Sequence, residues 1–208
     1  MWTKIRLRAA WAMVPLYLFF ARPTVTLMVA GLVVALAGVL IRGWAAGSIR
    51  KNKVLTTHGP YAFTRNPLYF GSFLIGIGFG IASGEWWIFG LFLVFFFVIY
   101  GKTMRREEKR LAELFGDEFD RYASAVPRFV PRFATWTDVT GATSPARPAV
   151  AYAATHDGAV AVMDAPAASP APAAKPHFRL SRYLGHREYQ ALLGIAVMYI
   201  ALVIKLSL

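Results

Sequence analysis

The residues best able to do chemistry gather just before an apolar stretch that begins at position 67. His58-Gly59-Pro60-Tyr61 is followed after three residues by Arg65-Asn66-Pro67-Leu68-Tyr69. Gly-Pro is a turn signal, and proline suits the first position of a helix, where its missing N–H costs nothing. The spacing therefore predicts Arg65 and Asn66 at a helix N-terminus, whose free N–H donors and partial positive charge favour a carboxylate or another anion.

Each of these residues also has a purely structural interpretation. Gly59, Pro60 and Pro67 are ordinary loop and helix-start residues, and Arg65 is an ordinary cytoplasmic anchor of a membrane helix. The combination favours a site, because several donors and acceptors in one short segment at membrane depth need polar partners.

Glu107 and Glu108 form a second candidate group just beyond the next apolar stretch. We expect them to return to the level of Arg65, because the two stretches are joined only by Gly84 and Glu85 and so form a tight helical hairpin. The alternative is a solvated acidic pair that balances its basic neighbours. Adjacent helical positions differ by about 100° in direction, so the two carboxylates need not share a role.

Arg128 is the third candidate, within Val126-Pro127-Arg128-Phe129. A guanidinium there is able to hold a carboxylate or phosphate bidentately, or to bind lipid headgroups instead.

The composition indicates a membrane protein. Of the 208 residues 57% are hydrophobic, and the formal net charge is +12. The basic residues lie between apolar runs and form no continuous patch, which suits anionic lipid headgroups and argues against nucleic acid. The absence of cysteine and the lack of ligand spacing among His156, His177 and His186 argue against a metal site.

The pattern predicts an all-α polytopic bundle of about five transmembrane helices plus a cytoplasmic interfacial helix. An apolar stretch of about 20 residues crosses the hydrocarbon core. The expected spans are Trp11–Ala21, Thr24–Ile41, Pro67–Ser83, Trp86–Met104 and Tyr189–Leu206, with Glu107–Tyr122 as the interfacial helix and Lys205 reaching the headgroups.

Loop charge gives the expected orientation and location. Basic residues precede the first span, follow the second (Arg42, Arg50, Lys51, Lys53 and Arg65) and close the fourth, which predicts a cytoplasmic N-terminus in a bacterial-type inner membrane. We divide the chain into a membrane core (1–133), a flexible linker rich in alanine and proline (134–180) and a C-terminal transmembrane segment (181–208).

Taken as an ordered set, these motifs resemble the isoprenylcysteine carboxyl methyltransferase and phospholipid methyltransferase superfamily. The resemblance covers roughly Leu27 to Arg132 and includes Gly59-Pro60-Tyr61, Arg65-Asn66-Pro67-Leu68-Tyr69, Glu107-Glu108, Phe115-Gly116 and Val126-Pro127-Arg128-Phe129. It implies an integral-membrane methyltransferase that uses S-adenosylmethionine and acts on a lipid-like or isoprenylcysteine-like acceptor at the cytoplasmic face, without a metal.

The resemblance also implies which residues form the site. Many members have histidine where this chain has Asn66, which leaves a polar contact there but no proton shuttle. The implied catalytic residues are Arg65, Glu108 and Arg128. Those implied to bind the cofactor are His58, Gly59, Tyr61, Arg65, Asn66, Pro67, Tyr69, Glu107 and Glu108.

Two other functions fit the same sequence. A membrane reductase of the steroid-reductase type has a similar spanning architecture and would bind a nicotinamide cofactor. A non-catalytic scaffold, whose basic loops only hold anionic lipid, would bind neither cofactor. The oligomeric state, the acceptor atom and the choice between Glu107 and Glu108 stay open at this level.

Overall fold

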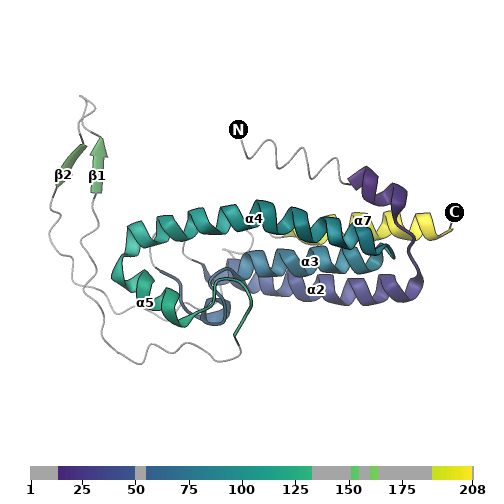
Figure 1. Cartoon of the computed structure of the whole chain (residues 1–208), viewed down its shortest axis with the longest axis horizontal. Helices are drawn as coiled ribbons and strands as arrows, with labels where there is room; N and C mark the ends of the chain where they lie inside the picture. Colours follow the sequence, from purple (N-terminus) through teal and green to yellow (C-terminus); the bar gives the residue numbers. More distant parts are fainter. Residues whose placement is uncertain (1–13, 50–54, 133–150, 155–159, 164–188, 208) are drawn as a thin grey trace.

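The architecture comes from a computed structural model, which describes residues 14–49, 55–132, 151–154, 160–163 and 189–207. Four helices run side by side along the long axis of the molecule (Figure 1): α2 (Val25–Ser48), α3 (Pro67–Ala82), α4 (Trp86–Phe115) and α7 (Tyr189–Ser207). Three of them, α2, α4 and α7, are long and apolar enough to cross a membrane, and α3 is a shorter apolar helix of 16 residues. The chain is therefore a helical membrane protein.

Bare backbone holds α2 against α3. A Cβ added to Gly38 would lie 2.5 Å from the carbonyl oxygen of Gly71, and one added to Gly78 would clash with the carbonyl oxygen of Gly31. Gly31 and Gly38 are seven residues apart on α2, and Gly71 and Gly78 are seven residues apart on α3. The two glycines of each helix therefore lie on one face of it. Small residues at these positions let the two backbones approach closely, as in other membrane helix pairs.

The predicted hairpin between α3 and α4 is confirmed. Its turn contains Gly84 with a φ of +70°, and Glu85 is the residue before α4. Toward this turn the rings of Phe89 and Phe92 rest directly on Gly80 and Gly76 of α3. The two helices are therefore closest together near their connection.

Two cationic side chains join the elements at the end of the bundle that contains this turn. Lys205 Nζ donates to the carbonyl oxygens of Leu18 (2.5 Å) and Phe19 (2.7 Å). Residues 14–20 are helical, and the carbonyls at the end of this helix attract a cation. That Lys205 reaches the headgroups stays a prediction. Nearby, Arg22 forms an ion pair with Glu85 at 3.3 Å.

The boundaries differ from the sequence prediction in two places. One continuous helix, α4, runs from Trp86 to Phe115, so the predicted break before an interfacial helix is wrong. The break comes at Gly116, whose φ of +51° suits glycine, and α5 (Asp117–Ala125) follows. Likewise α2 continues past Ile41, so Arg42 lies inside a helix and not in a loop.

The five-span count and the linker are only partly covered by the described residues. Residues 11–13 of the first predicted span and the basic residues Arg50, Lys51 and Lys53 lie outside them, whereas residues 14–20 of that span are described and helical. Within 134–180, two four-residue strands, β1 (Ala151–Ala154) and β2 (Val160–Met163), pair antiparallel with Ala151 opposite Met163. The sequence analysis did not anticipate this hairpin.

The α2–α3 contact gives a first prediction. Gly78→Ala should lower the stability of the protein by about 1–3 kcal/mol, because the new methyl group meets the Gly31 carbonyl and a Cβ of Ala35 at 2.8 Å. Thermal unfolding in detergent micelles, followed by size-exclusion chromatography of the heated sample, measures the change.

The matched control is Gly90→Ala on α4, where nothing lies within 4 Å of an added Cβ. This variant should unfold at the wild-type temperature or slightly above it. Equal losses in both variants would show that the α2–α3 backbone contact is not what the glycines provide.

Candidate functional site

The loop before α3 has the local structure that its sequence predicts. Gly59–Ala62 form a short 3₁₀ helix, η1, and Gly59 has a φ of +62°. Pro67 occupies the first turn of α3, directly after Asn66. Arg65 and Asn66 are therefore at the N-terminus of a helix, at the end of the bundle opposite the C-terminus of the chain (Figure 1).

A second segment, residues 127–132, runs alongside this loop, and we call it the return segment. The backbone N–H of Arg65 donates to the carbonyl of Pro127 at 2.9 Å, and that of Arg132 donates to the carbonyl of Phe63 at 2.9 Å. These bonds fix the return segment antiparallel to residues 63–65. Arg128 is thereby brought beside Arg65, although 62 residues separate the two in the sequence.

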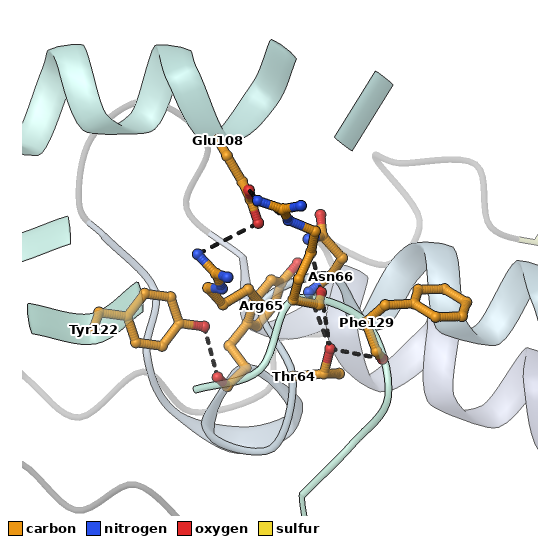
Figure 2. Close-up of polar contacts among 8 residues, drawn as sticks. Thr64, Arg65, Asn66, Glu108, Tyr122 and Phe129 are labelled. Carbon is orange, nitrogen blue, oxygen red and sulfur yellow. Dashed lines mark hydrogen bonds and ion pairs between the residues drawn. The ribbon is translucent and has the colours of Figure 1, made fainter. Parts of the chain in front are cut away.

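Two buried side chains hold the return segment in its register. The amide nitrogen of Asn66 donates to the carbonyl oxygen of Arg128 at 2.9 Å, and the hydroxyl of Thr64 donates to that of Phe129 at 3.0 Å. Both side chains lie between the loop and the return segment in Figure 2. Since each satisfies a backbone carbonyl, Asn66 serves here as a structural donor.

Glu108 lies between two arginines at the centre of this arrangement (Figure 2). Its Oε2 is 2.7 Å from both Nε and Nη2 of Arg128, and its Oε1 is 3.4 Å from Nη1 of Arg65. The side chains of Glu108 and Arg65 are only 10% and 14% exposed, whereas that of Arg128 is 48% exposed. One carboxylate thus balances two guanidinium groups, and one positive charge is left in excess.

Two buried polar atoms of this cluster accept or donate no hydrogen bond within the described part of the chain. They are Nε of Arg65 and Oε1 of Glu108. A buried donor without a partner is costly unless a ligand or water supplies one. The cluster therefore offers an incoming molecule one donor for an anion and one acceptor for a cation or hydroxyl.

Tyr122 of α5 lies beside the cluster (Figure 2). Its hydroxyl donates to the carbonyl oxygen of Tyr61 at 2.7 Å, and its ring packs with Leu55, Phe119 and Val126. Burial raises the pKa of Tyr122 well above its ordinary range; the nearby Arg65 opposes this shift and Glu108 adds to it. The phenol consequently stays protonated and keeps donating.

The remaining candidates lie at different distances from the cluster. Glu107 is exposed and accepts a hydrogen bond of 3.0 Å from the hydroxyl of Tyr69 on α3. His58 is also exposed, and its Nδ1 is 3.1 Å from the hydroxyl of Thr57. The structure thus joins Arg65, Asn66, Glu108 and Arg128, and leaves His58 at the surface.

Sequence reasoning missed Thr64 and misjudged Arg42. Thr64 stands between two recognised motifs, and its near-complete burial at 2% exposure has no local signal. Arg42 donates from α2 to the carbonyl of Leu68 at 3.3 Å and to the hydroxyl of Ser72, so it fixes the start of α3. The sequence did contain a signal for Arg42: it directly follows the apolar stretch that ends at Ile41, within one helical turn of it.

A hollow with a volume of about 210 Å³ lies on the other side of the loop. Apolar atoms form its walls, and it is bounded by the end of α2, η1, the start of α3 and the end of the return segment. Its lining residues are Ile41, Trp44, Pro60, Phe63, Thr64, Pro67, Phe70, Pro131 and Arg132.

Comparison with known proteins places this arrangement in context. Residues 24–118 match the family model described as phospholipid methyltransferase. The chain is 35% identical over 120 residues to a cobalt-zinc-cadmium resistance protein of Cupriavidus metallidurans, with 54% of each chain covered. It is 36% identical over 93 residues to a nickel-cobalt-cadmium resistance protein of Alcaligenes xylosoxydans xylosoxydans, with 44% of this chain and 43% of the relative covered.

A third relative is the protein-S-isoprenylcysteine O-methyltransferase of Schizosaccharomyces pombe. It is 30% identical over 86 residues, which are 41% of this chain and 36% of the relative. The matches therefore span about half of each relative's length or less. No solved structure matches the chain.

The two adjacent glutamates allow a matched test of the cluster. Glu108→Gln should lower the free energy of unfolding by about 2 kcal/mol, because it leaves two guanidinium groups facing each other without their carboxylate. Since Arg128 is half exposed, this loss is smaller than that for a fully buried ion pair. Glu107→Gln should change it by less than about 0.5 kcal/mol. Thermal unfolding of both variants in detergent measures the two changes. A larger loss in Glu107→Gln than in Glu108→Gln would contradict the assignment of Glu108 as the partner of the arginines.

The buried phenol predicts an alkaline effect. The folded protein holds the proton of Tyr122 more tightly than the unfolded chain, whose tyrosines titrate near pH 10. The stability that protonated Tyr122 contributes to the folded protein is therefore complete below about pH 10 and is lost as the pH rises above that value. Removing the hydroxyl also breaks one buried hydrogen bond, at a cost of about 1 kcal/mol.

Tyr122→Phe should accordingly lower the melting temperature at about pH 8 and narrow its gap to wild type at about pH 11. Tyr69→Phe, which removes a hydroxyl bonded to exposed Glu107, is the control at about pH 8 and should leave the melting temperature there close to that of wild type. A gap that stays constant with pH would refute the role given to Tyr122.

Proposed function

Because residues 24–118 belong to the phospholipid methyltransferase family, we propose that this protein is a methyltransferase that uses S-adenosylmethionine and acts on a lipid-like acceptor. The observation that supports the proposal best is the cluster of Glu108 with Arg65 and Arg128 at the N-terminus of α3. The similarity to an isoprenylcysteine O-methyltransferase supports the same reaction class.

The cluster fits the charged end of this cofactor. The amino-acid part of S-adenosylmethionine has one carboxylate and one ammonium group. The excess positive charge and the buried Nε of Arg65 suit the carboxylate, and Oε1 of Glu108 suits the ammonium or a ribose hydroxyl. In this proposal Arg65 binds the anionic group and Glu108 the cationic one, while Arg128 holds Glu108 in place.

Positioning is the main task that the reaction leaves to the protein. The sulfonium methyl of the bound cofactor is already activated toward a nucleophile. What the chain must do is hold the acceptor in line with that methyl group and keep water away. Asn66 and Thr64 contribute by fixing the return segment, and the apolar helices around the cluster exclude water.

The acceptor is proposed to arrive at the cytoplasmic end of the bundle. The exposed side of α4 beyond the apolar region contains Lys102, Arg105, Arg106, Lys109 and Arg110, as the positive-inside rule expects of a cytoplasmic end. The cluster is at this same end, close to the inner-leaflet headgroups. An amphiphile dissolved in that leaflet reaches it without leaving the membrane.

Two relatives are named for resistance to metals, and this suggests a physiological setting. Among the described residues, no group of three or more His, Asp or Glu side chains could hold a metal ion, and the sequence has no cysteine. Under the proposed function, a part in metal tolerance would act through methylation of a membrane component.

Calorimetric titration of the purified, detergent-solubilised protein with S-adenosylmethionine tests the proposal. Arg65→Ala and Glu108→Ala should each weaken binding by about tenfold or more, because each removes a charge-assisted contact worth about 1.5–3 kcal/mol. Arg110→Ala, on the exposed side of α4, is the control and should bind like wild type.

The titration also separates the rival functions. Unchanged affinity in both cluster variants would refute the assignment of the site. Heat on titration with a reduced nicotinamide cofactor, but not with S-adenosylmethionine, would favour a reductase, and no heat with either would favour a scaffold. Thermal unfolding of each variant in the same detergent shows whether a loss of binding reflects a loss of fold.

A further inference from the structure

The space between α3 and α4 widens toward the candidate site. Near their connection, Phe89 and Phe92 of α4 rest on the bare backbone of Gly80 and Gly76. One to two turns closer to Glu108, the same helices are held apart by whole rings. Phe73 of α3 faces Phe96 at 5.0 Å and Phe97 at 5.7 Å between ring centroids.

A ring from outside the hairpin fills the wide part of this gap. Phe129 of the return segment lies 5.8 Å from Phe70 and 5.3 Å from Phe73 of α3, and 5.8 Å from Phe96 and 5.9 Å from Phe97 of α4. Its side chain points away from Glu108 (Figure 2). The return segment thus inserts an apolar wedge between two membrane helices.

The ring-filled gap lies between the bilayer and the level of the ion-pair cluster, and on the cluster side of it the rings of Tyr69 and Tyr100 are in contact at 5.4 Å. At its outer side, Phe97 is 50% exposed and Val94 is 64% exposed, on a helix that spans the membrane, whereas Phe96 is 1% exposed. At its polar end, Glu108 lies eleven residues along α4 from Phe97, about 16 Å at 1.5 Å per residue. An amphiphile with its chain beside Phe97 would have its polar end near the cluster.

We propose that this gap is the site for the apolar chain of the acceptor, and that Phe129 is the residue that determines which chains enter it. The inference rests on the proposed function and adds to it a place and a specificity-determining residue. In the chain-free protein the Phe129 ring occupies the site. A chain from the surrounding lipid enters between the two helices and displaces that ring, while Asn66 and Thr64 keep the backbone of the return segment in place.

A lipid chain is the occupant that the surroundings favour. The gap opens on helix faces that lie in the hydrocarbon region, where acyl chains are the neighbouring molecules. A second helix would not fit, because Phe89 and Phe92 already rest on the α3 backbone below the gap. Only the wide end, now filled by one ring, has room for a flexible chain.

The test uses the full-length protein in nanodiscs that contain a phosphatidylcholine with a photoactivatable diazirine on its acyl chain. After illumination, mass spectrometry gives the share of label on residues 67–104. Phe129→Ala should raise that share about threefold or more, because the chain no longer competes with the ring for the gap. Phe129→Trp should lower it below wild type.

Phe63→Ala is the matched control, because it removes a ring of the same size from the neighbouring antiparallel segment. Phe63 borders the hollow beside Trp44 and not the gap between α3 and α4. Its labelling of residues 67–104 should equal that of wild type. Equal labelling in the Phe129→Ala and wild-type proteins, or an increase only in Phe63→Ala, would overturn the proposal; if Phe129→Ala does not fold, unchanged labelling in Phe129→Trp does so.

This result is independent of the cofactor. Labelling that follows Phe129 in a protein that binds no S-adenosylmethionine would keep the chain site and reject methyl transfer. Normal cofactor binding with labelling that ignores Phe129 would reject the chain site and keep the methyltransferase.

Discussion

The pairing of one buried carboxylate with two guanidinium groups is the constraint on which the site depends. Glu108 comes from a membrane helix, Arg65 from the loop before another, and Arg128 from the return segment. Charges removed from water at the membrane boundary must be balanced by protein groups. Meeting that requirement fixes three distant segments around one point, and the hydrogen bonds of Thr64 and Asn66 complete the arrangement.

The helix packing explains why this point can also serve a ligand from the membrane. Glycines bring the backbones of α2 and α3 together along their length, so this pair forms a rigid half of the bundle. The α3–α4 pair is close only near its connecting turn and opens toward the cluster, where aromatic rings fill the space. Rings are easier to displace than backbone contacts, so the open end suits a site and the closed end suits a scaffold.

The proposed chemistry divides between the two sides of the return segment. On one side Arg128 contacts Glu108, where charged groups of a cofactor would bind; on the other side Phe129 contacts the apolar gap. Arg128 and Phe129 are neighbours in the chain but contact different partners, so this short segment separates polar from apolar surroundings. The match of residues 24–118 to the phospholipid methyltransferase family model agrees with a site of this mixed character.

The sequence by itself determined what depends on neighbouring residues. Apolar length located α2, α4 and α7, Gly59-Pro60 located the turn, Pro67 located the start of α3, and the short connection at Gly84 required a hairpin. Only the tertiary structure decided which carboxylate faces the arginines. Glu107 and Glu108 point in different directions from α4, and which direction leads to the arginines depends on where α3 lies. The same holds for Thr64, for the anchoring of Lys205 and for the wedge at Phe129, since each joins residues far apart in the chain, and local pattern says nothing about such pairs.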